Sequence, residues 1–403
     1  MNEIDRNTAA NAPEPRRQSY AQWVRQAIGL ARGKGTPVIS LFESSVPEPR
    51  ALLRAAVAAT VEPDFGHFYV SAFSGGNPFV IDMLAARYGV ARHQILGTTG
   101  ATGGLSLLYG AFTRPGDHIL VETPGFDLFQ DLAATRGVAI GTFTRRAPDY
   151  GIDPAEVEAR LRPETRLIVL SNLHNPSGMA LDHEVLVRLA EIAERRGVLL
   201  VVDEVYGDYA DASVRPGPAV ALSPAVVSVS SLTKIYGLAT LRCGWIVGAA
   251  SVVEAVRDLG SRLEFGISTL SHAVAARVIE DSAPFLAHSQ GVIARSRPLI
   301  ARWLAEMRAE GLVEGDLPEA GCIFFPRLVG VDDTEAFATQ LIEERGVIVA
   351  PGEYFGAAGH VRIGFGMPAE VLEPALDRLT VALRARRATS GHDFSEHSGA
   401  LLI

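Results

Sequence analysis

The sequence predicts an α/β protein: a large domain with a mainly parallel sheet covered by helices on both faces, and a smaller α+β domain beside it. Short, near-continuous apolar runs alternate with helical segments through the middle of the chain, which is typical of parallel strands buried on both sides. Polar residues follow several of these runs at the point where each strand ends. At 403 residues, the chain is also longer than one hydrophobic core usually supports.

The composition excludes several classes of protein. Apolar residues make up 48% of the chain and charged residues 21%, which is ordinary for a globular enzyme. The net charge of −9 and the lack of a basic run argue against nucleic-acid binding. The polar N-terminus and the absence of long apolar runs predict neither export nor a membrane span. Cys243 and Cys322 lack the spacing of a disulfide framework or zinc site, so we expect a cytoplasmic protein without a bound metal.

The N-terminal part of the chain is predicted to be a loose arm followed by three helices. The expected ranges are residues 1–17 for the arm and residues 20–30, 50–60 and 78–88 for the helices. Between the last two helices lies an aromatic, glycine-rich segment that includes Tyr69. We interpret this segment as a loop that forms part of a binding site.

Residues 94–112 predict a short strand, a glycine-rich turn and an apolar helix. Backbone N–H groups of Gly100, Ala101 and Thr102 would converge at the helix N-terminus, where the helix dipole also favours a phosphate. The string TGATGG is also similar to the turn of nicotinamide-dependent short-chain oxidoreductases. Those enzymes carry the turn near the chain start and use a Tyr followed four residues later by Lys, and no tyrosine in this sequence has that spacing.

The middle of the chain predicts βαβ units. The apolar runs cover residues 118–122, 138–143, 166–172, 198–204 and 225–230. Polar residues lie at or just after the ends of these runs, namely Thr123 to Phe126, Asn175, Asp203 with Tyr206, and Lys234. Ligands of open α/β sheets bind at the carboxyl ends of the strands, so we expect these residues to share one site.

Lys234 is the candidate covalent nucleophile of this site. A lysine is usually solvated at the surface, but this one lies on a short connection between two apolar runs. Its amine is suited to form a Schiff base with an aldehyde cofactor, while Ser231 and Arg242 offer a hydroxyl and a planar cation to a phosphate. The sequence therefore predicts pyridoxal 5′-phosphate as the cofactor.

Six motifs, TTGATGG, TPGF, HNPSG, DEVY, SSLTK and LRCGW, occur in this order between residues 97 and 248. The set resembles the class I/II aminotransferases, pyridoxal-phosphate enzymes of the aspartate aminotransferase fold, and VRIGFG near Gly366 extends the match. The resemblance implies a homodimer that moves an amino group between an L-amino acid and a 2-oxo acid. It also implies that Arg362 clamps the substrate α-carboxylate, that Phe126 lies over the cofactor ring and that Tyr69 reaches the neighbouring subunit's site.

The remaining site residues have chemical reasons of their own. A carboxylate beside the pyridine nitrogen of the cofactor keeps that nitrogen protonated, and Asp203 fits this role better than that of a helix cap. The phenol of Tyr206 and the amide of Asn175 are suited to donate hydrogen bonds to the phenolic oxygen of the cofactor. Asn175 is also an expected substrate contact, although its NPSG string is otherwise typical of a plain turn.

The C-terminal part is predicted to be the smaller domain. A long helix over residues 284–310 is followed by short strands, an amphipathic helix and a final helix to about residue 387. We predict an arm and part of the small domain in residues 1–47, the large cofactor-binding domain in residues 48–283, and the rest of the small domain in residues 284–403.

The sequence departs from the family pattern in two places, and three alternative functions stay open. Ser44 and Ser45 stand where the resemblance leads us to expect a glycine, and a second arginine for dicarboxylic substrates is represented only by Arg262, on position alone. A lyase or decarboxylase on the same scaffold would keep Lys234 and the cofactor. The nicotinamide oxidoreductase and a non-catalytic regulator are further alternatives, but no N-terminal DNA-binding domain supports a regulator.

Overall fold

The structure is a computed structural model that describes residues 18–33, 38–70, 75–263 and 266–396. The expected arm of residues 1–17 lies outside this description. No helix in the described part of the chain is both long and apolar enough to cross a membrane.

The largest element is an eight-stranded sheet, and it confirms the predicted α/β class. In spatial order its strands are β2 (Ile95–Thr99), β9 (Cys243–Val247), β8 (Val226–Ser231), β7 (Leu199–Asp203), β6 (Thr165–Ser171), β3 (His118–Thr123), β4 (Ala139–Arg146) and β5 (Gly151–Ile152). The central strands β8, β7, β6, β3 and β4 run parallel. Strand β9 is antiparallel to both of its neighbours, and β5 is antiparallel to β4. The parallel strands end at one edge of the sheet, which is where the predicted site residues follow them.

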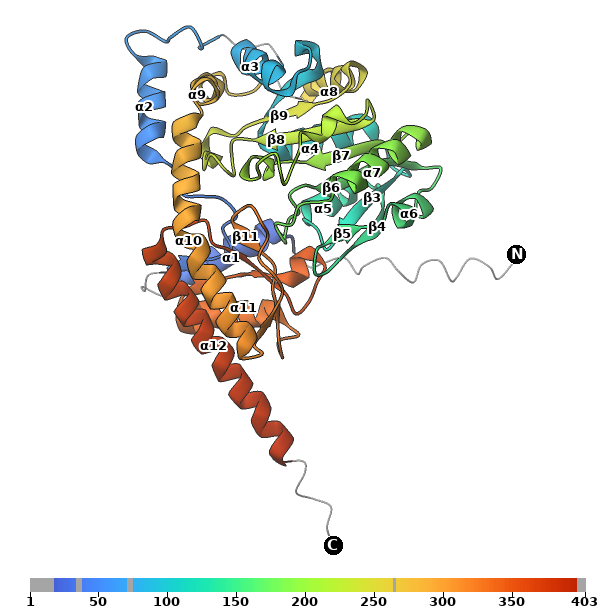
Figure 1. Cartoon of the computed structure of the whole chain (residues 1–403). Coiled ribbons are helices and arrows are strands. Elements are labelled where there is room, and N and C mark those ends of the chain that lie inside the picture. The colour runs from blue at the N-terminus through green and yellow to red at the C-terminus, as the bar shows by residue number, and fades with distance from the viewer. Residues whose placement is uncertain (1–17, 34–37, 71–74, 264–265, 397–403) are drawn as a thin grey trace, which may run out of the picture.

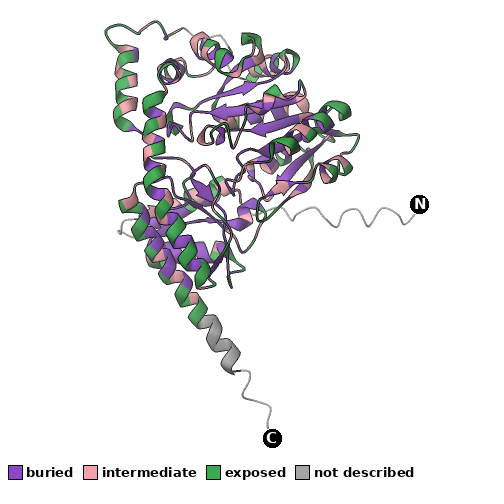
Figure 2. Ribbon diagram, viewed as in Figure 1, coloured by how far each residue is buried: buried purple, intermediate pink, exposed green. Residues whose placement is uncertain are grey.

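Helices cover both faces of this sheet (Figures 1 and 2). One face packs against α4 (Gly100–Phe112), α5 (Leu128–Ala134) and α8 (Ala250–Leu263), and the other against α6 (Pro154–Ala159) and α7 (His183–Arg196). Along β3, Ile119 and Val121 belong to the first core and Leu120 belongs to the second. Because neighbouring side chains of a strand point to opposite faces, two-sided burial explains why these strands read as continuous apolar runs.

A second, smaller unit combines the N-terminal helix with the C-terminal part of the chain. Its helices are α1 (Tyr20–Arg32), α11 (Thr334–Arg345), α12 (Ala369–Glu396) and part of α10 (Ala283–Ala309), which runs from one unit to the other in Figure 1. Its strands are β1 (Ile39–Ser40) with β13 (Val347–Ile348), β10 (Val313–Glu314) with β12 (Arg327–Leu328), and β11 (Ile323–Phe324) with β15 (Val361–Gly364) and β14 (Ala350–Pro351). One core joins Trp23 to Trp303, Phe324 and Leu341. The chain boundaries of the two units, at residues 47 and 283, stay a prediction.

Three further helices, α2 (Arg50–Val61), α3 (Pro78–Tyr88) and α9 (Thr269–Glu280), lie at the far end of the large sheet (Figure 1). Helix α3 begins and ends as its sequence predicts. Asn77 caps its N-terminus by accepting hydrogen bonds from two backbone N–H groups, and Gly89 ends it in the left-handed conformation.

A loop after β1 is pressed against β15. The N–H of Gly364 donates to the carbonyl of Leu41 over 2.6 Å. A Cβ atom at Gly364 would lie 1.7 Å from the carbonyl oxygen of Glu43, so only glycine permits this contact. This close approach fixes residues 41–44 at the edge of the cavity described below.

A buried ion pair lies beneath the carboxyl ends of the central strands. Arg145 Nε donates to Glu122 Oε2 over 2.7 Å, and both side chains are fully buried. Arg145 also donates to the carbonyl of Ser171, whose hydroxyl donates to Glu122 and accepts from the N–H of Asn175. This network joins three neighbouring strands to the loop that carries Asn175.

We expect Arg145→Met to reduce the free energy of unfolding by about 3–5 kcal/mol, because it leaves Glu122 buried without its cation. Urea unfolding measures the change. The control is Arg146→Met, the next residue, whose side chain is 68% exposed and pairs with Glu156. That variant should lose less than about 1 kcal/mol, and equal losses in the two variants would contradict a special role for the buried pair.

Candidate functional site

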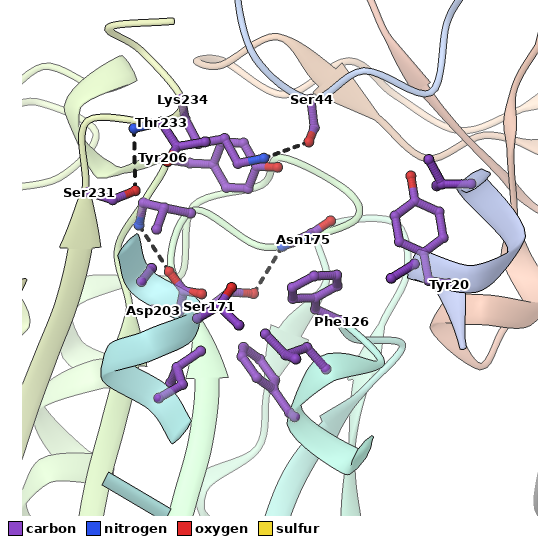
Figure 3. A pocket seen from close by; sticks show the side chains of 18 of the residues that line it. Tyr20, Ser44, Phe126, Ser171, Asn175, Asp203, Tyr206, Ser231, Thr233 and Lys234 are labelled. Atoms are coloured by element: carbon purple, nitrogen blue, oxygen red, sulfur yellow. Dashed lines mark hydrogen bonds between the residues drawn. The ribbon is translucent and has the colours of Figure 1, made fainter. Parts of the chain in front are cut away.

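A cavity of about 420 Å³ opens at the carboxyl ends of the central strands, between the large sheet and α1. Ten of the residues predicted from the sequence line it: Ala101, Thr102, Phe126, Asn175, Asp203, Tyr206, Ser231, Lys234, Arg242 and Arg362. Figure 3 shows several of these side chains pointing into one space although they come from distant parts of the chain. Two predicted residues, Gly100 and Tyr69, are not part of the lining.

One end of the cavity fits a phosphate. Ala101 and Thr102 lie in the first turn of α4, and the side chain of the preceding Thr99 caps none of the N–H groups of that turn. Gly100 has a φ of +72°, and a Cβ there would lie 2.7 Å from Arg242 Nη2, so glycine lets the guanidinium approach the helix. The ion pairs of the described residues do not include Arg242, which leaves its charge available for an anion.

Ser231 adds a hydroxyl near this end of the cavity. Its Oγ accepts a hydrogen bond from the N–H of Thr233 over 3.3 Å. The hydroxyl hydrogen takes no part in that bond and is able to donate to a phosphate oxygen. The hydroxyl, the guanidinium and the helix N-terminus therefore face the same cavity, and their binding of a phosphate stays a prediction.

Asp203 is a buried carboxylate at the end of β7. It is 6% exposed, and its Oδ1 accepts the N–H of Val205 over 3.1 Å. Burial raises its pKa to about 7, despite the opposing effects of that hydrogen bond and of the charge on Lys234. A cation bound beside Asp203 would favour the ionised carboxylate, so the position suits the protonated ring nitrogen of pyridoxal phosphate.

The walls of the cavity offer polar atoms and an aromatic face. Tyr206 is 2% exposed, and its hydroxyl has no hydrogen-bond partner among the described residues. Asn175 is positioned by its N–H, which donates to Ser171 Oγ over 2.9 Å. Phe126 lies beside them, with its ring edge-on to Tyr20 at 6.5 Å between centroids. An unsatisfied buried hydroxyl normally indicates a missing partner, and the phenolic oxygen of the cofactor is a suitable one.

Lys234 projects its amine into the cavity. Its Nζ donates to Ser44 Oγ over 2.8 Å and lies 5.4 Å from the centroid of the Tyr206 ring. Ser44 belongs to the loop that is pressed against β15. The sequence had marked Ser44 only as a departure from the family pattern, and the structure brings it into direct contact with the candidate nucleophile.

Arg362 is a buried cation held by neutral groups. It is 2% exposed, and its guanidinium donates to Asn175 Oδ1 (2.7 Å), Tyr20 Oη (2.7 Å) and the carbonyl of Phe42 (3.0 Å). The rings of Tyr20 and Phe355 lie 5.3 and 4.9 Å from it. None of the ion pairs among the described residues involves Arg362, so its charge has no carboxylate partner there. A buried guanidinium without a counter-ion is suited to bind one.

Sequence reasoning missed several residues of the lining. Tyr20 was predicted only as the start of a helix, and no local signal indicates that its hydroxyl meets an arginine 342 positions away. Arg25 and Glu43 add one charge of each sign, both on exposed residues of the lining. Arg262, suggested on position alone, does not line this cavity: its side chain is 71% exposed and pairs with Asp258 on the same helix, so a contact with substrate stays a prediction.

Tyr69 lies outside the cavity. It is 40% exposed and its ring packs on Phe65, with 4.6 Å between centroids. Part of the glycine-rich segment, residues 71–74, is outside the described residues. A role for Tyr69 in the site of a neighbouring subunit therefore stays a prediction.

A family model and individual relatives both match most of this chain. The family model described as aminotransferase class I and II matches residues 40–379. A capreomycidine synthase from Streptomyces vinaceus is 30% identical over 84% of this chain and 81% of its own length. An arginine–pyruvate transaminase from Pseudomonas aeruginosa is 26% identical over 90% of this chain and 94% of its own length.

Solved structures share the fold. A pyridoxal-phosphate-dependent aminotransferase from Streptococcus suis is 24% identical, with a TM-score of 0.80 over 93% of this chain and 99% of that one. The aspartate aminotransferase of Thermus thermophilus with maleate is 22% identical, with a TM-score of 0.80 over 95% of this chain and 100% of that one.

Asp203 should make the stability of the cofactor-free protein depend on pH. Its pKa is about 7 in the folded chain against an ordinary value of 3.8, so the folded state holds the extra proton between about pH 4 and pH 7. The free energy of unfolding therefore falls as pH rises through this window, by on the order of 4 kcal/mol.

Asp203→Asn removes the ionisation, so this variant should be more stable than the wild type at pH 8 and similar to it at pH 4. Urea unfolding of both cofactor-free proteins across this range measures the difference. Asp316→Asn, at a half-exposed carboxylate that pairs with Arg308, is the control and should follow the wild-type profile. Parallel profiles for wild type and Asp203→Asn would show that burial does not raise this pKa.

Proposed function

Since the chain belongs to the class I and II aminotransferase family, we propose that the cavity described above is the active site in which it moves an amino group between an L-amino acid and a 2-oxo acid. Enzymes of this family depend on pyridoxal 5′-phosphate. When bound, this cofactor supplies an electron sink for the pair of electrons left on the substrate Cα atom.

The residues that line the cavity would hold different parts of the cofactor. The N–H groups of Gly100, Ala101 and Thr102, the hydroxyl of Ser231 and the guanidinium of Arg242 would bind its phosphate. Asp203 would hold the proton on the ring nitrogen, and Tyr206 and Asn175 would donate to the phenolic oxygen. Phe126 would stack on the ring, and Lys234 would form the covalent Schiff-base link.

The buried, carboxylate-free guanidinium of Arg362 is the observation that carries the proposal. Its planar fork suits a bidentate substrate carboxylate, and its neutral partners Asn175, Tyr20 and Phe42 orient it without neutralising it. With the carboxylate fixed there, the amine of Lys234 removes the proton from the substrate Cα.

Arg362→Lys should raise the KM for the amino acid about 100-fold, because an ammonium group cannot reproduce the two parallel hydrogen bonds of the guanidinium. Steady-state kinetics measure the change. The matched control is Arg146→Lys, at a surface arginine with a 68% exposed side chain, which should leave KM unchanged. An unaltered KM in Arg362→Lys would rule out the clamp.

The type of reaction can be tested without a second substrate. Individual acidic, basic, aliphatic and aromatic L-amino acids are added to the enzyme, and the products are quantified. A transaminase should form one equivalent of 2-oxo acid per active site and then stop until a 2-oxo acid acceptor is added. Continuous release of carbon dioxide or ammonia without an acceptor would instead support the decarboxylase or lyase.

We further propose a cytoplasmic homodimer. Val57, Phe65, Tyr69 and Leu270 are apolar or aromatic residues exposed by 38–53% on α2, the loop after it and α9. Helix α2 buries only Thr60 although most of its residues are apolar. A second copy covering this region would bury these side chains. Both cysteines are free and buried, which suits a reducing compartment.

Val57→Asp should weaken the dimer, because it places a charge in the covered surface. Sedimentation of wild type and variant at several concentrations measures the association. Val381→Asp is the control, since Val381 is 46% exposed on α12, away from these residues. A wild-type protein that is an active monomer at working concentration would exclude the homodimer.

A further inference from the structure

Ser44 is a serine where the family resemblance predicts a glycine, and its hydroxyl is the hydrogen-bond acceptor for Lys234. We propose that Ser44 is a positioning residue that holds the free amine of Lys234 for proton transfer at the substrate Cα. The inference rests on the proposed role of Lys234 as the covalent nucleophile and adds a residue that acts through it.

The contact is well formed. The distance from Lys234 Nζ to Ser44 Oγ is 2.8 Å, and Ser44 is 8% exposed (Figure 3). Both residues line the cavity that also contains Asp203 and Arg362. A glycine at position 44 would have no side-chain atom to make this hydrogen bond.

The loop that carries Ser44 has little freedom to move. The carbonyl of Leu41 accepts from the N–H of Gly364, and the carbonyl of Phe42 accepts from Arg362. The missing side chain of Gly364 leaves room for the carbonyl of Glu43. Ser44 is therefore fixed relative to the strand that bears Arg362, and one short loop connects the proposed carboxylate clamp to the amine of Lys234.

A hydroxyl at this position suits an amine that changes its protonation state. With cofactor and substrate bound, the amine of Lys234 would be free at the end of a flexible side chain. A neutral amine donates one N–H to Ser44 Oγ and keeps its lone pair free to take the Cα proton. As the Cα–H bond breaks, its electron pair stays on the substrate and a new N–H bond forms. The resulting ammonium still donates to Ser44 and faces the Tyr206 ring.

Removing the hydroxyl should slow the proton transfer and leave substrate binding intact. We expect Ser44→Ala and Ser44→Gly to lower kcat about tenfold, the factor expected when one hydrogen bond to a charged group is lost, and to change KM less than twofold. The isotope effect on kcat with an α-deuterated amino acid should rise. Ser44→Thr keeps the hydroxyl and should restore most of kcat. Ser45→Ala, the neighbouring serine outside the lining, is the matched control.

A second measurement uses the cofactor-free protein and no catalytic turnover. Stopped-flow absorbance follows the rate at which the cofactor-free protein becomes covalently linked to added pyridoxal 5′-phosphate. Ser44→Ala should reduce this rate several-fold, because the amine is no longer held toward the cavity. Its Kd for pyridoxine 5′-phosphate, which has an alcohol in place of the aldehyde and cannot form the link, should equal that of the wild type.

The possible results separate the inference from the proposed function. Lys234→Ala should abolish covalent capture, and a persisting link in that variant would overturn the role of Lys234 itself. If Lys234→Ala behaves as expected but Ser44→Ala captures at the wild-type rate with an unchanged isotope effect, only the role of Ser44 is wrong. A weaker Kd for pyridoxine 5′-phosphate in Ser44→Ala, or no recovery in Ser44→Thr, would assign Ser44 a merely structural role and also overturn the inference.

Discussion

The hydrogen bonds around the Arg362 guanidinium are the constraint on which the rest of the site depends. They join β15 of the smaller unit to Tyr20 in the N-terminal helix, to Phe42 in the loop after β1 and to Asn175 beyond the end of β6. These segments belong to both units of the fold and lie as far as 342 positions apart. At the carboxyl edge of the large sheet this side chain contacts both units, alongside other contacts such as that of the Tyr20 N–H with Asp127 and that of the Gly125 N–H with the carbonyl of Phe355.

The buried charges of this protein fall into two kinds. Glu122 and Arg145 neutralise each other beneath the sheet edge, and their polar neighbours satisfy the remaining oxygen and nitrogen atoms. Asp203 and Arg362 instead line the cavity without an ion-pair partner among the described residues. A buried ionisable group without a counter-ion is unfavourable for folding in its charged form, which for Asp203 is expressed as the raised pKa, so such groups at a cavity indicate binding rather than stability. The ion pair of Glu122 and Arg145 supports the loop of Asn175, whereas we propose that Asp203 and Arg362 bind groups of opposite charge.

The loop after β1 connects these features. Its carbonyl groups bind Arg362 and Gly364, while Ser44 reaches the amine of Lys234. The loop thus contacts both residues to which we assign substrate roles, Arg362 through the carbonyl of Phe42 and Lys234 through Ser44. In the proposed mechanism, one short segment would position both the group that binds the substrate carboxylate and the group that transfers the proton.

The sequence alone was enough to predict the mainly parallel sheet and ten of the residues that line the cavity. A continuous apolar run indicates a strand that is buried on both faces. Polar residues that follow parallel strands lie at the same edge of the sheet, because those strands run in the same direction. The contacts of Tyr20 and Ser44 were decided only by the tertiary structure. Each depends on a contact between distant segments, Tyr20 with Arg362 and Ser44 with Lys234, and no periodicity or local spacing encodes such a meeting. The same reason explains why Arg262, chosen on chain position alone, lies outside the cavity.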